Sequence, residues 1–255
     1  MSILVIGGTG KTGRRVTDRL KARGHDVRVA ARSTGFHWDR PDTWAPHLAG
    51  ARAVYLVTNP LSTDTSKEVA DLLGRTEARV VLLSARDIHS PAEAPVREHT
   101  GGWTILRPTW FAQNFTEDLF AGFMERGRLA LPTGEGREPF VDLADVADVA
   151  VEALTDPGHD GRAYDLSGPE LLSFREAVAL LGRGVEYEPV TAEEFKREIA
   201  GFGEELAEYT AGLLVDIANG ANAYLSDGVQ QVLGRAPGRF ADFVARVDAA
   251  RTAGE

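Results

Sequence analysis

Short apolar runs alternate with longer amphipathic stretches along the first two thirds of the chain. The apolar runs are rich in β-branched residues and nearly continuous, which is typical of strands buried on both faces of a parallel sheet. These runs are Ile3–Ile6, Val27–Ala31, Ala53–Val57, Arg79–Leu83, Trp103–Leu106 and Ala163–Leu166. The amphipathic stretches predict helices at Thr12–Arg23, about Asp42–Leu48, Ser66–Leu73, about Pro91–His99, Asn114–Arg126 and Leu143–Leu154.

A strand, helix, strand order repeated in this way predicts an α/β fold with a doubly wound parallel sheet and right-handed crossovers. We expect the strand order 3-2-1-4-5-6 with a seventh strand added. After Pro189 the pattern changes, because Thr191–Glu194 reads as a capping box and the chain to Ala250 looks helical. We therefore predict a sheet domain over 1–188 and a small helical cap over 189–255 that completes a substrate pocket and is not independent.

The first strand runs directly into a glycine-rich turn, Gly7-Gly8-Thr9-Gly10-Lys11-Thr12-Gly13, and a helix follows. In this strand–turn–helix setting the G-x-x-G-x-x-G spacing is typical of a Rossmann dinucleotide-binding loop. Gly7 permits the tight turn, Gly10 lets a pyrophosphate approach the backbone, and Gly13 lets the helix pack closely on the strand. A P-loop is excluded, because its first glycine would fall on Val5 inside the strand.

The end of the second strand bears on the choice of cofactor. Binders of NAD place an acidic side chain there for the ribose 2′-hydroxyl, whereas this chain has Arg32. A guanidinium can hold a 2′-phosphate through a forked, charge-assisted contact, so we expect NADPH to be preferred, with NADH as the alternative cofactor. The other interpretations of Arg32 are a solvated cation at the strand end and a side chain that stacks on adenine.

Composition and charge narrow the class of protein. The formal charge of −10 and the lack of any Lys/Arg run argue against nucleic acid as a partner. The 255-residue chain has no cysteine, which excludes thiolate catalysis and sulfur-ligated metal and fits a reducing compartment. We expect neither a signal peptide nor a membrane span, and hence a cytoplasmic protein.

Several segments together resemble the NmrA-like family of atypical short-chain dehydrogenase/reductases. The most specific is Trp103–Asn114 (WTILRPTWFAQN), supported by Asp142–Ala150 (DLADVADVA) and Tyr164–Glu170 (YDLSGPE). The glycine loop, Arg32, Phe36–Asp39, Ala53–Asn59, Phe140–Ala150 and Gly161–Glu170 extend the resemblance over nearly the whole chain. That family includes NAD(P)H-dependent quinone, azo-dye and triphenylmethane reductases, and also members that sense the cofactor and regulate transcription factors.

The resemblance and the ligand-binding edge of such sheets imply a set of site residues. Cofactor would be bound by Gly7, Thr9, Gly10, Lys11, Thr12, Gly13, Arg32, Asp39, Thr58, Asn59, Ser84, Pro108 and Thr109. Asp39 is expected near the adenine, or else as a cap of the turn at Pro41. Trp110, Phe111 and Asn114 would bind a planar aromatic substrate, although both rings could equally pack against the C-terminal helices.

Catalytic residues are harder to assign. The Tyr-x-x-x-Lys pair of typical short-chain dehydrogenases is absent, and the segment Ser84–Thr100 looks shortened, with Pro91 and Pro95 disturbing its helix. His89 and His99 are weak candidates for a proton donor. No histidine spacing fits a metal site, and the Asp142, Asp145 and Asp148 series is interpreted as structural, with Asp142 capping the helix and Asp145 at its positive dipole end.

Three functions remain in competition. The leading hypothesis is an NADPH-dependent reductase of a small quinone-like or conjugated aromatic acceptor, because such hydride transfer needs orientation and an apolar pocket more than a dedicated acid. The second is a cofactor-sensing regulatory protein without turnover, which the shortened segment favours. The third is a biosynthetic enzyme of the same fold that performs cyclisation or dehydration.

Overall fold

The computed structural model describes residues 2–59, 65–86, 90–117 and 119–252. Its strands are β1 (Ser2–Ile6), β2 (Val27–Ala30), β3 (Ala51–Val57), β4 (Arg79–Leu83), β5 (Trp103–Pro108), β6 (Arg128–Leu131), β7 (Arg137–Glu138), β8 (Arg162–Leu166), β9 (Leu172–Ser173) and β10 (Glu186–Pro189). All six apolar runs of the sequence form strands within a few residues of their expected bounds.

The helices follow the predicted order as well. They are α1 (Lys11–Ala22), α2 (Trp44–Leu48), α3 (Thr65–Leu73), α4 (Glu93–Arg97), α5 (Asn114–Glu117), α6 (Leu119–Glu125), α7 (Leu143–Thr155), α8 (Phe174–Leu181), α9 (Ala192–Glu198), α10 (Glu204–Ala218), α11 (Gly228–Leu233) and α12 (Phe240–Thr252). Four short 3₁₀ turns are η1 (Arg32–Thr34), η2 (Pro41–Thr43), η3 (Pro157–His159) and η4 (Ala200–Phe202). No helix in the described ranges has the length and apolar character needed to cross a bilayer.

The chain forms two compact units, each built from three segments. Unit 1 comprises Met1–Pro108, Leu143–Leu166 and Asp227–Ala236, and unit 2 comprises Thr109–Asp142, Ser167–Ser226 and Pro237–Glu255. The helices after Pro189 are thus divided, because α11 belongs to unit 1 while α9, α10 and α12 belong to unit 2.

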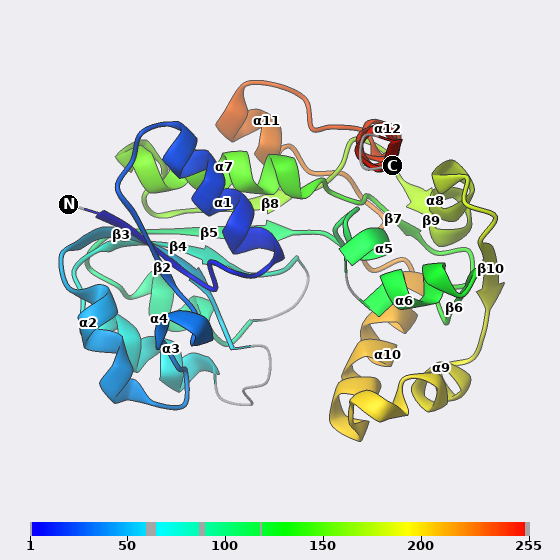
Figure 1. The fold of residues 1–255 in the computed structure, drawn as a ribbon, viewed down its shortest axis with the longest axis horizontal. Coiled ribbons are helices and arrows are strands. Elements are labelled where there is room, and N and C mark those ends of the chain that lie inside the picture. Colours follow the sequence, from blue (N-terminus) through cyan, green and yellow to red (C-terminus); the bar gives the residue numbers. More distant parts are fainter. Residues whose placement is uncertain (1, 60–64, 87–89, 118, 253–255) are drawn as a thin grey trace. The chain divides into compact units, whose positions relative to one another are not determined.

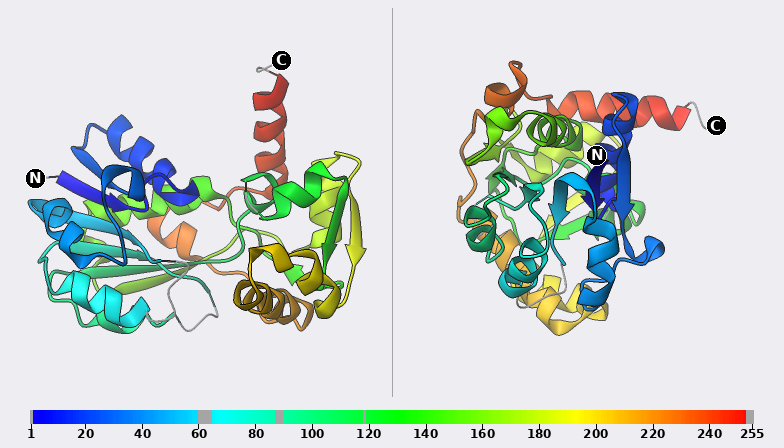
Figure 2. Two further views of the ribbon diagram at one scale, coloured as in Figure 1. Left: turned by 60° about the horizontal axis from the view of Figure 1, so that its bottom comes forward. Right: turned by 90° about the vertical axis from the view of Figure 1, so that its left-hand side faces the viewer.

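Unit 1 is a three-layer sandwich around a parallel six-stranded sheet (Figures 1 and 2). Helices α1 and α7 cover one face, and α2, α3 and α4 cover the other (Figure 1). Successive residues of a strand point to opposite faces, so β1 sends Leu4 and Ile6 into the core beneath α2 and α3 while Ile3 and Val5 face α1 and α7. All four side chains are fully buried.

The doubly wound α/β class is confirmed, and the strand order is β2-β1-β3-β4-β5-β8. The expected order 3-2-1-4-5-6 with a seventh strand differs at one edge, since no described strand lies outside β2. The segment between β2 and β3 folds instead as η1, η2 and α2. The backbone after β2 turns back on itself: the N–H groups of Thr34 and Phe36 both donate to the Ala31 carbonyl, and Gly35 between them adopts a left-handed φ of 86°, so the chain is not extended where an edge strand would continue.

Unit 2 combines short strand pairs with helices around an aromatic core. β6 pairs in parallel with β10, and β7 pairs antiparallel with β9. Phenylalanine dominates the core, which contains Phe115, Phe120, Phe123, Phe140, Phe174, Phe195, Phe240 and Phe243. The predicted capping box is present at α9, where the Thr191 hydroxyl accepts from the Glu194 N–H and the Glu194 carboxylate accepts from the Thr191 N–H.

Candidate cofactor-binding site

The glycine-rich turn joins β1 to α1 and has the backbone geometry that its sequence predicts. Gly7 adopts a positive φ of 76°, which a residue with a side chain rarely adopts. A Cβ on Gly13 would lie 2.3 Å from the Gly7 carbonyl oxygen, so only glycine permits this approach of helix to turn. A Cβ on Gly10 would meet only that same carbonyl, at 3.2 Å. Gly7 and Gly13 are therefore needed by the fold, whereas Gly10 leaves space in front of the loop.

The amino terminus of α1 has the features of an anion site. Gly10 is its N-cap residue and supplies no side-chain cap, and the first turn contains no acidic residue. The first N–H groups of a helix have no intrahelical partner, and the helix dipole places positive potential there. Thr9 is exposed, Lys11 is half-buried and Thr12 is buried. The loop thus presents backbone donors and one cation to an incoming phosphate.

Arg32 lies close to this loop. The Gly7 N–H donates to the carbonyl of Ala30 at 2.9 Å, which ties the turn to the end of β2, and Arg32 follows two residues later at the start of η1. Its side chain is exposed, and among the described residues it has no ion-pair partner. Arg32 is therefore a cation at the carboxyl edge of the sheet that is available to a ligand.

The strand order places the loop at the point where the chain reverses its direction across the sheet. From β1 the chain passes to β2 on one side and then to β3 on the other, and dinucleotides bind at such switch points. Thr58 and Asn59 follow β3, Ser84 follows β4, and Pro108 ends β5, so all four lie at this same edge. Ser84 is two strand spacings from β1, or about 10 Å.

A buried ion pair, which the sequence analysis did not identify, lies at this edge beside Ser84. Glu93, the first residue of α4, is 8% exposed. Its Oε1 accepts from the Ser84 hydroxyl at 2.8 Å and from Arg107 Nε at 2.7 Å, and its Oε2 also accepts from Arg107. Burial raises the pKa of Glu93, but the hydrogen bonds from Arg107 and Ser84 outweigh it, so the pKa is lowered overall. Glu93 is an anion at neutral pH.

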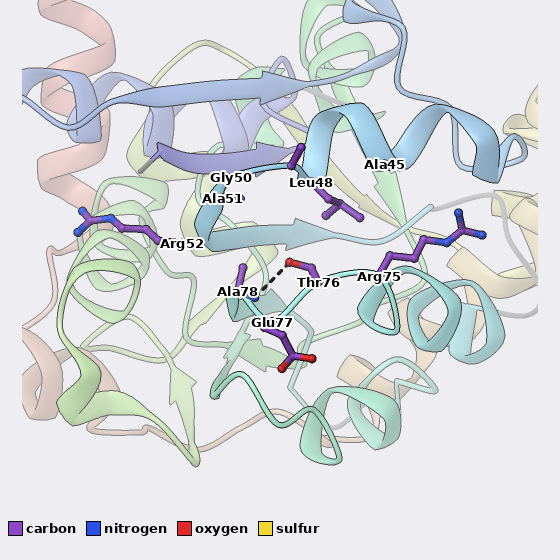
Figure 3. A pocket seen from close by; sticks show the side chains of 10 residues that line it. Ala45, Leu48, Gly50, Ala51, Arg52, Arg75, Thr76, Glu77 and Ala78 are labelled. Atoms are coloured by element: carbon purple, nitrogen blue, oxygen red, sulfur yellow. Dashed lines mark hydrogen bonds between the residues drawn. The ribbon is translucent and has the colours of Figure 1, made fainter.

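The opposite edge of the sheet holds a surface pocket of about 570 Å³ that does not belong to this site (Figure 3). It is lined by residues of α2, by the start of β3 and by the residues before β4, and its charged members are Arg52, Arg75 and Glu77. His99 is at this amino-terminal edge too, because its Nε2 lies 2.8 Å from the carbonyl of Ala78, which immediately precedes β4. The hypothesis of His99 as a proton donor is therefore withdrawn, since the cofactor edge is at the other end of that strand.

Two further predicted residues do not add to the site as described. His89 lies outside the described residues. Asp39 is exposed, and the alternative that it caps the turn at Pro41 is wrong, because the N-cap residue of η2 is Arg40 and no side chain caps it. Next to Asp39 the Trp38 ring packs edge-on against Phe36, with centroids 5.4 Å apart.

The predicted substrate residues lie in unit 2, where the aromatic core supports them. The Trp110 ring stacks on Phe120 at 5.5 Å with an interplanar angle of 7° and remains partly exposed. Phe111 forms an isolated parallel bridge with Val141, and the Asn114 N–H donates to the Phe111 carbonyl at 3.0 Å. The Thr109 hydroxyl, expected at the cofactor, donates to the Pro139 carbonyl at 2.7 Å and is buried.

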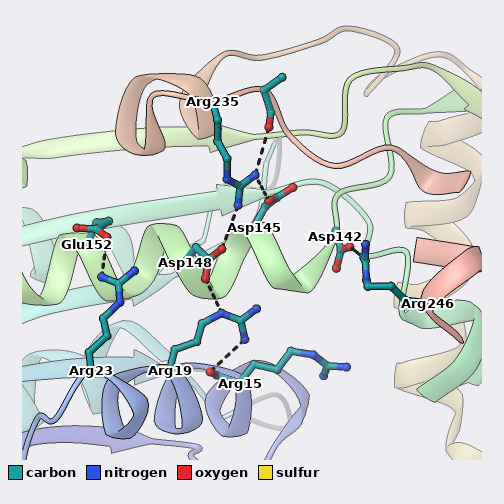
Figure 4. A network of polar contacts seen from close by, with 10 residues as sticks. Arg15, Arg19, Arg23, Asp142, Asp145, Asp148, Glu152, Arg235 and Arg246 are labelled. Carbon is teal, nitrogen blue, oxygen red and sulfur yellow. Dashed lines mark hydrogen bonds and ion pairs between the residues drawn. The ribbon is translucent and has the colours of Figure 1, made fainter. Parts of the chain in front are cut away.

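Asp142, just before α7, and Asp145 and Asp148 within it form ion pairs with arginine side chains (Figure 4). Asp145 accepts from Arg235 at 2.7 Å, and Asp148 accepts from both Arg235 and Arg19. Asp142, in unit 2, accepts from Gln113 Nε2 at 2.8 Å and from Arg246. Among the described residues no group of three or more His, Cys, Asp or Glu could hold a metal ion. The carboxylates therefore serve in ion pairs and hydrogen bonds.

Comparisons with known proteins identify the family. The model of the NAD dependent epimerase/dehydratase family matches residues 3–101, which contain the glycine loop and the first four strands. The NAD(P)H azoreductase of Xenophilus azovorans is 32% identical over 278 residues, covering 94% of this chain and 96% of that protein. The chain belongs to the atypical short-chain dehydrogenase/reductases. It is thus a member of an NAD(P)-dependent oxidoreductase family, as its resemblance to NmrA-like proteins implied.

Other members of the atypical short-chain dehydrogenase/reductases agree with this assignment. An uncharacterized oxidoreductase of Bacillus subtilis (strain 168), YesF, is 32% identical and covers 95% of this chain and 94% of its own length. The triphenylmethane reductase of Citrobacter sp., solved as a complex with NADP(H), superposes with a TM-score of 0.77 at 21% identity. That superposition covers 96% of this chain and 99% of the reductase, and it shows that the two proteins share the fold.

Proposed function

We propose that this protein is an NADPH-dependent reductase of a small quinone-like or conjugated aromatic acceptor. The observation that carries the cofactor preference is Arg32, an exposed cation without an ion-pair partner in the described chain, beside a loop that has the geometry of a pyrophosphate site. An unpaired guanidinium gains more from a 2′-phosphate than one that must leave an existing carboxylate. The azoreductase and triphenylmethane reductase relatives support the acceptor class, because both act on conjugated aromatic dyes by their names.

The residues of unit 1 fit NADPH, which when bound supplies the hydride. The α1 amino terminus and Lys11 hold the pyrophosphate, Arg32 holds the 2′-phosphate, and Ser84 lies at the edge where the nicotinamide half belongs. Trp110, Phe111 and Asn114 of unit 2 bind the acceptor, with the rings as stacking surface and the amide to orient one polar group.

In this proposal the reduced acceptor takes its proton from water. Burial raises the pKa of Tyr55, Tyr164 and Tyr187 above the ordinary value of a phenol, which makes each a poorer acid at neutral pH. Glu93 has a lowered pKa and is already ionised. The chain therefore acts by orientation and by an apolar surface, and an oxyanion delocalised over an aromatic system leaves the site before it is protonated.

The test is oxidation of NADPH, followed at its near-ultraviolet absorbance, against a panel of quinones, azo dyes and triphenylmethane dyes. We expect at least one class to be reduced, with a lower KM for NADPH than for NADH. Tight binding of NADPH without reduction of any acceptor would instead favour a cofactor-sensing protein. Absence of binding to either nucleotide would refute the proposal.

A further inference from the structure

The buried carboxylate of Glu93 has a feature that the proposed function does not use. It joins three elements at the cofactor edge, because Ser84 follows β4, Glu93 begins α4 and Arg107 lies in β5. Arg107 contacts both carboxylate oxygens, one through Nε and the other through a terminal nitrogen, in the forked arrangement that fixes the plane of a carboxylate. Arg97 is only a peripheral partner, at 3.4 Å from Oε2.

This arrangement determines the hydrogen-bonding role of Ser84. A serine hydroxyl has one proton and two lone pairs, and an ionised carboxylate only accepts. The Ser84 proton is therefore donated to Glu93 Oε1, 2.8 Å away, and the lone pairs of Oγ are left for another partner. Ser84 is half-buried and lies at the carboxyl end of β4, so that partner can be a ligand at the cofactor edge.

We infer that Glu93, held by Arg107, is a positioning residue that makes the Ser84 hydroxyl a hydrogen-bond acceptor for the nicotinamide half of bound NADPH. This inference rests on the proposed function. The matching donors on that half are the ribose hydroxyls and the carboxamide N–H group. The pyrophosphate oxygens only accept hydrogen bonds at neutral pH, so a Ser84 hydroxyl that acts as an acceptor does not favour them. The bound dinucleotide therefore has its nicotinamide half, and not its pyrophosphate, at Ser84.

The polarity can be reversed by one substitution. In Glu93→Gln the amide oxygen is favoured at the Oε2 position, where terminal nitrogens of both Arg107 and Arg97 donate, and the NH₂ group then points at Ser84. Ser84 must then accept from Gln instead of donating. The Ser84 proton would face the ligand, opposite another donor. We expect Glu93→Gln to weaken NADPH binding about tenfold, and Ser84→Ala about fivefold, in line with the loss of one hydrogen bond.

The experiment is a double-mutant cycle of Ser84→Ala and Glu93→Gln, with two ligands titrated by calorimetry. NADPH reports on the whole site, and adenosine 2′,5′-bisphosphate reports on the phosphate sites alone. If Glu93 acts through Ser84, the double variant binds NADPH no more weakly than Ser84→Ala does. Without the Ser84 hydroxyl, the substitution at Glu93 has no donor to turn toward the ligand. Both single variants and the double variant should bind the bisphosphate within about twofold of the wild type. Arg97→Gln removes the peripheral contact to Glu93 and the Arg97 contact with the Trp103 ring, and leaves Arg107 and Ser84 in place, so it should bind both ligands normally.

The outcomes separate the inference from the proposed function. Additive losses in the double variant, or equal losses for the bisphosphate, would mean that Glu93 only supports the fold, and would overturn the inference while NADPH binding stands. Failure of the wild type to bind either ligand would overturn both. If Glu93→Gln does not fold, Glu93→Asp takes its place in the cycle, since it keeps the charge opposite Arg107 but its shorter side chain withdraws the carboxylate from Ser84.

The same cycle repeated with the 3-acetylpyridine analogue of the cofactor identifies the donor. That analogue keeps the ribose hydroxyls and lacks the carboxamide N–H. If Ser84→Ala weakens binding of the analogue as it weakens binding of NADPH, the contact is to the ribose. If Ser84→Ala weakens binding of NADPH alone, the contact is to the carboxamide. If Ser84→Ala binds both NADPH and the analogue as tightly as the wild type does, the inference is overturned.

Discussion

Arg32→Ala is the sharpest test of cofactor selectivity. The side chain is exposed and has no ion-pair partner in the described chain, so its removal leaves no buried charge behind and should not change the free energy of unfolding measurably. A charge-assisted hydrogen bond contributes about 1.5–3 kcal/mol, and solvent exposure favours the lower end of that range. About 1.5 kcal/mol corresponds to a loss of roughly tenfold in NADPH affinity. NADH has no 2′-phosphate, so its affinity should change less than about twofold.

The assay is calorimetric titration of both nucleotides at one fixed ionic strength, because contacts between exposed charges weaken as salt rises. Arg52→Ala is the matched control, since it removes the same charge at the opposite edge of the sheet, where Arg52 lines the pocket in Figure 3. Equal losses for NADPH and NADH would refute the 2′-phosphate role. A loss of NADPH affinity in Arg52→Ala as large as that in Arg32→Ala would show that net charge alone is responsible.

Three other substitutions test separate parts of the structure. Gly10→Val should abolish binding of both nucleotides while the protein still folds, because its side chain would occupy the space in front of the loop and its Cβ would meet only the Gly7 carbonyl, at 3.2 Å; normal binding by calorimetry would contradict the assignment of the loop. Trp110→Ala should lower kcat for an identified acceptor at least tenfold with NADPH affinity intact, whereas unfolding seen by circular dichroism would make the ring a packing residue. The fold lowers the pKa of Glu93, so its ion pair stabilises the protein at neutral pH, and this stability is lost as the pH falls through the acid range. Chemical denaturation at pH 7 and pH 4 should therefore show a smaller drop in the free energy of unfolding for Glu93→Gln than for the wild type. Equal drops in the two proteins would count against this role of Glu93.

The sequence predicted the sheet and the backbone geometry of the glycine-rich turn because both depend on local signals. A buried parallel strand is a continuous apolar run, and the spacing of Gly7, Gly10 and Gly13 reflects contacts within a single turn. The strand order at the edge was harder to predict, since it depends on whether the chain after β2 stays extended. The turn at residues 34–36 that prevents this depends on backbone hydrogen bonds to Ala31, which no residue pattern specifies.

The Glu93–Arg107 pair could not be found in the same way. Its members lie on a helix and on a strand, and each is flanked by ordinary residues, so no motif joins them. Pairing becomes evident only when β4 and β5 are placed side by side with α4 beyond their ends. The role of Trp110 was left open for a similar reason. Its stacking on Phe120 depends on the packing of α6, and the sequence does not specify that packing.

The segmented composition of unit 1 has a consequence for synthesis on the ribosome. Its last segment, Asp227–Ala236, is translated after nearly all of unit 2, yet α11 in that segment packs on α7 and β8. The approach is close, because a Cβ on Gly228 would lie 2.3 Å from the Asp165 carbonyl, and Arg235 completes the ion pairs of Asp145 and Asp148. Until residue 236 leaves the exit tunnel, α11 cannot pack on α7 and β8. A nascent chain that stalls before this point leaves the surface that α11 buries open to chaperones and to aggregation.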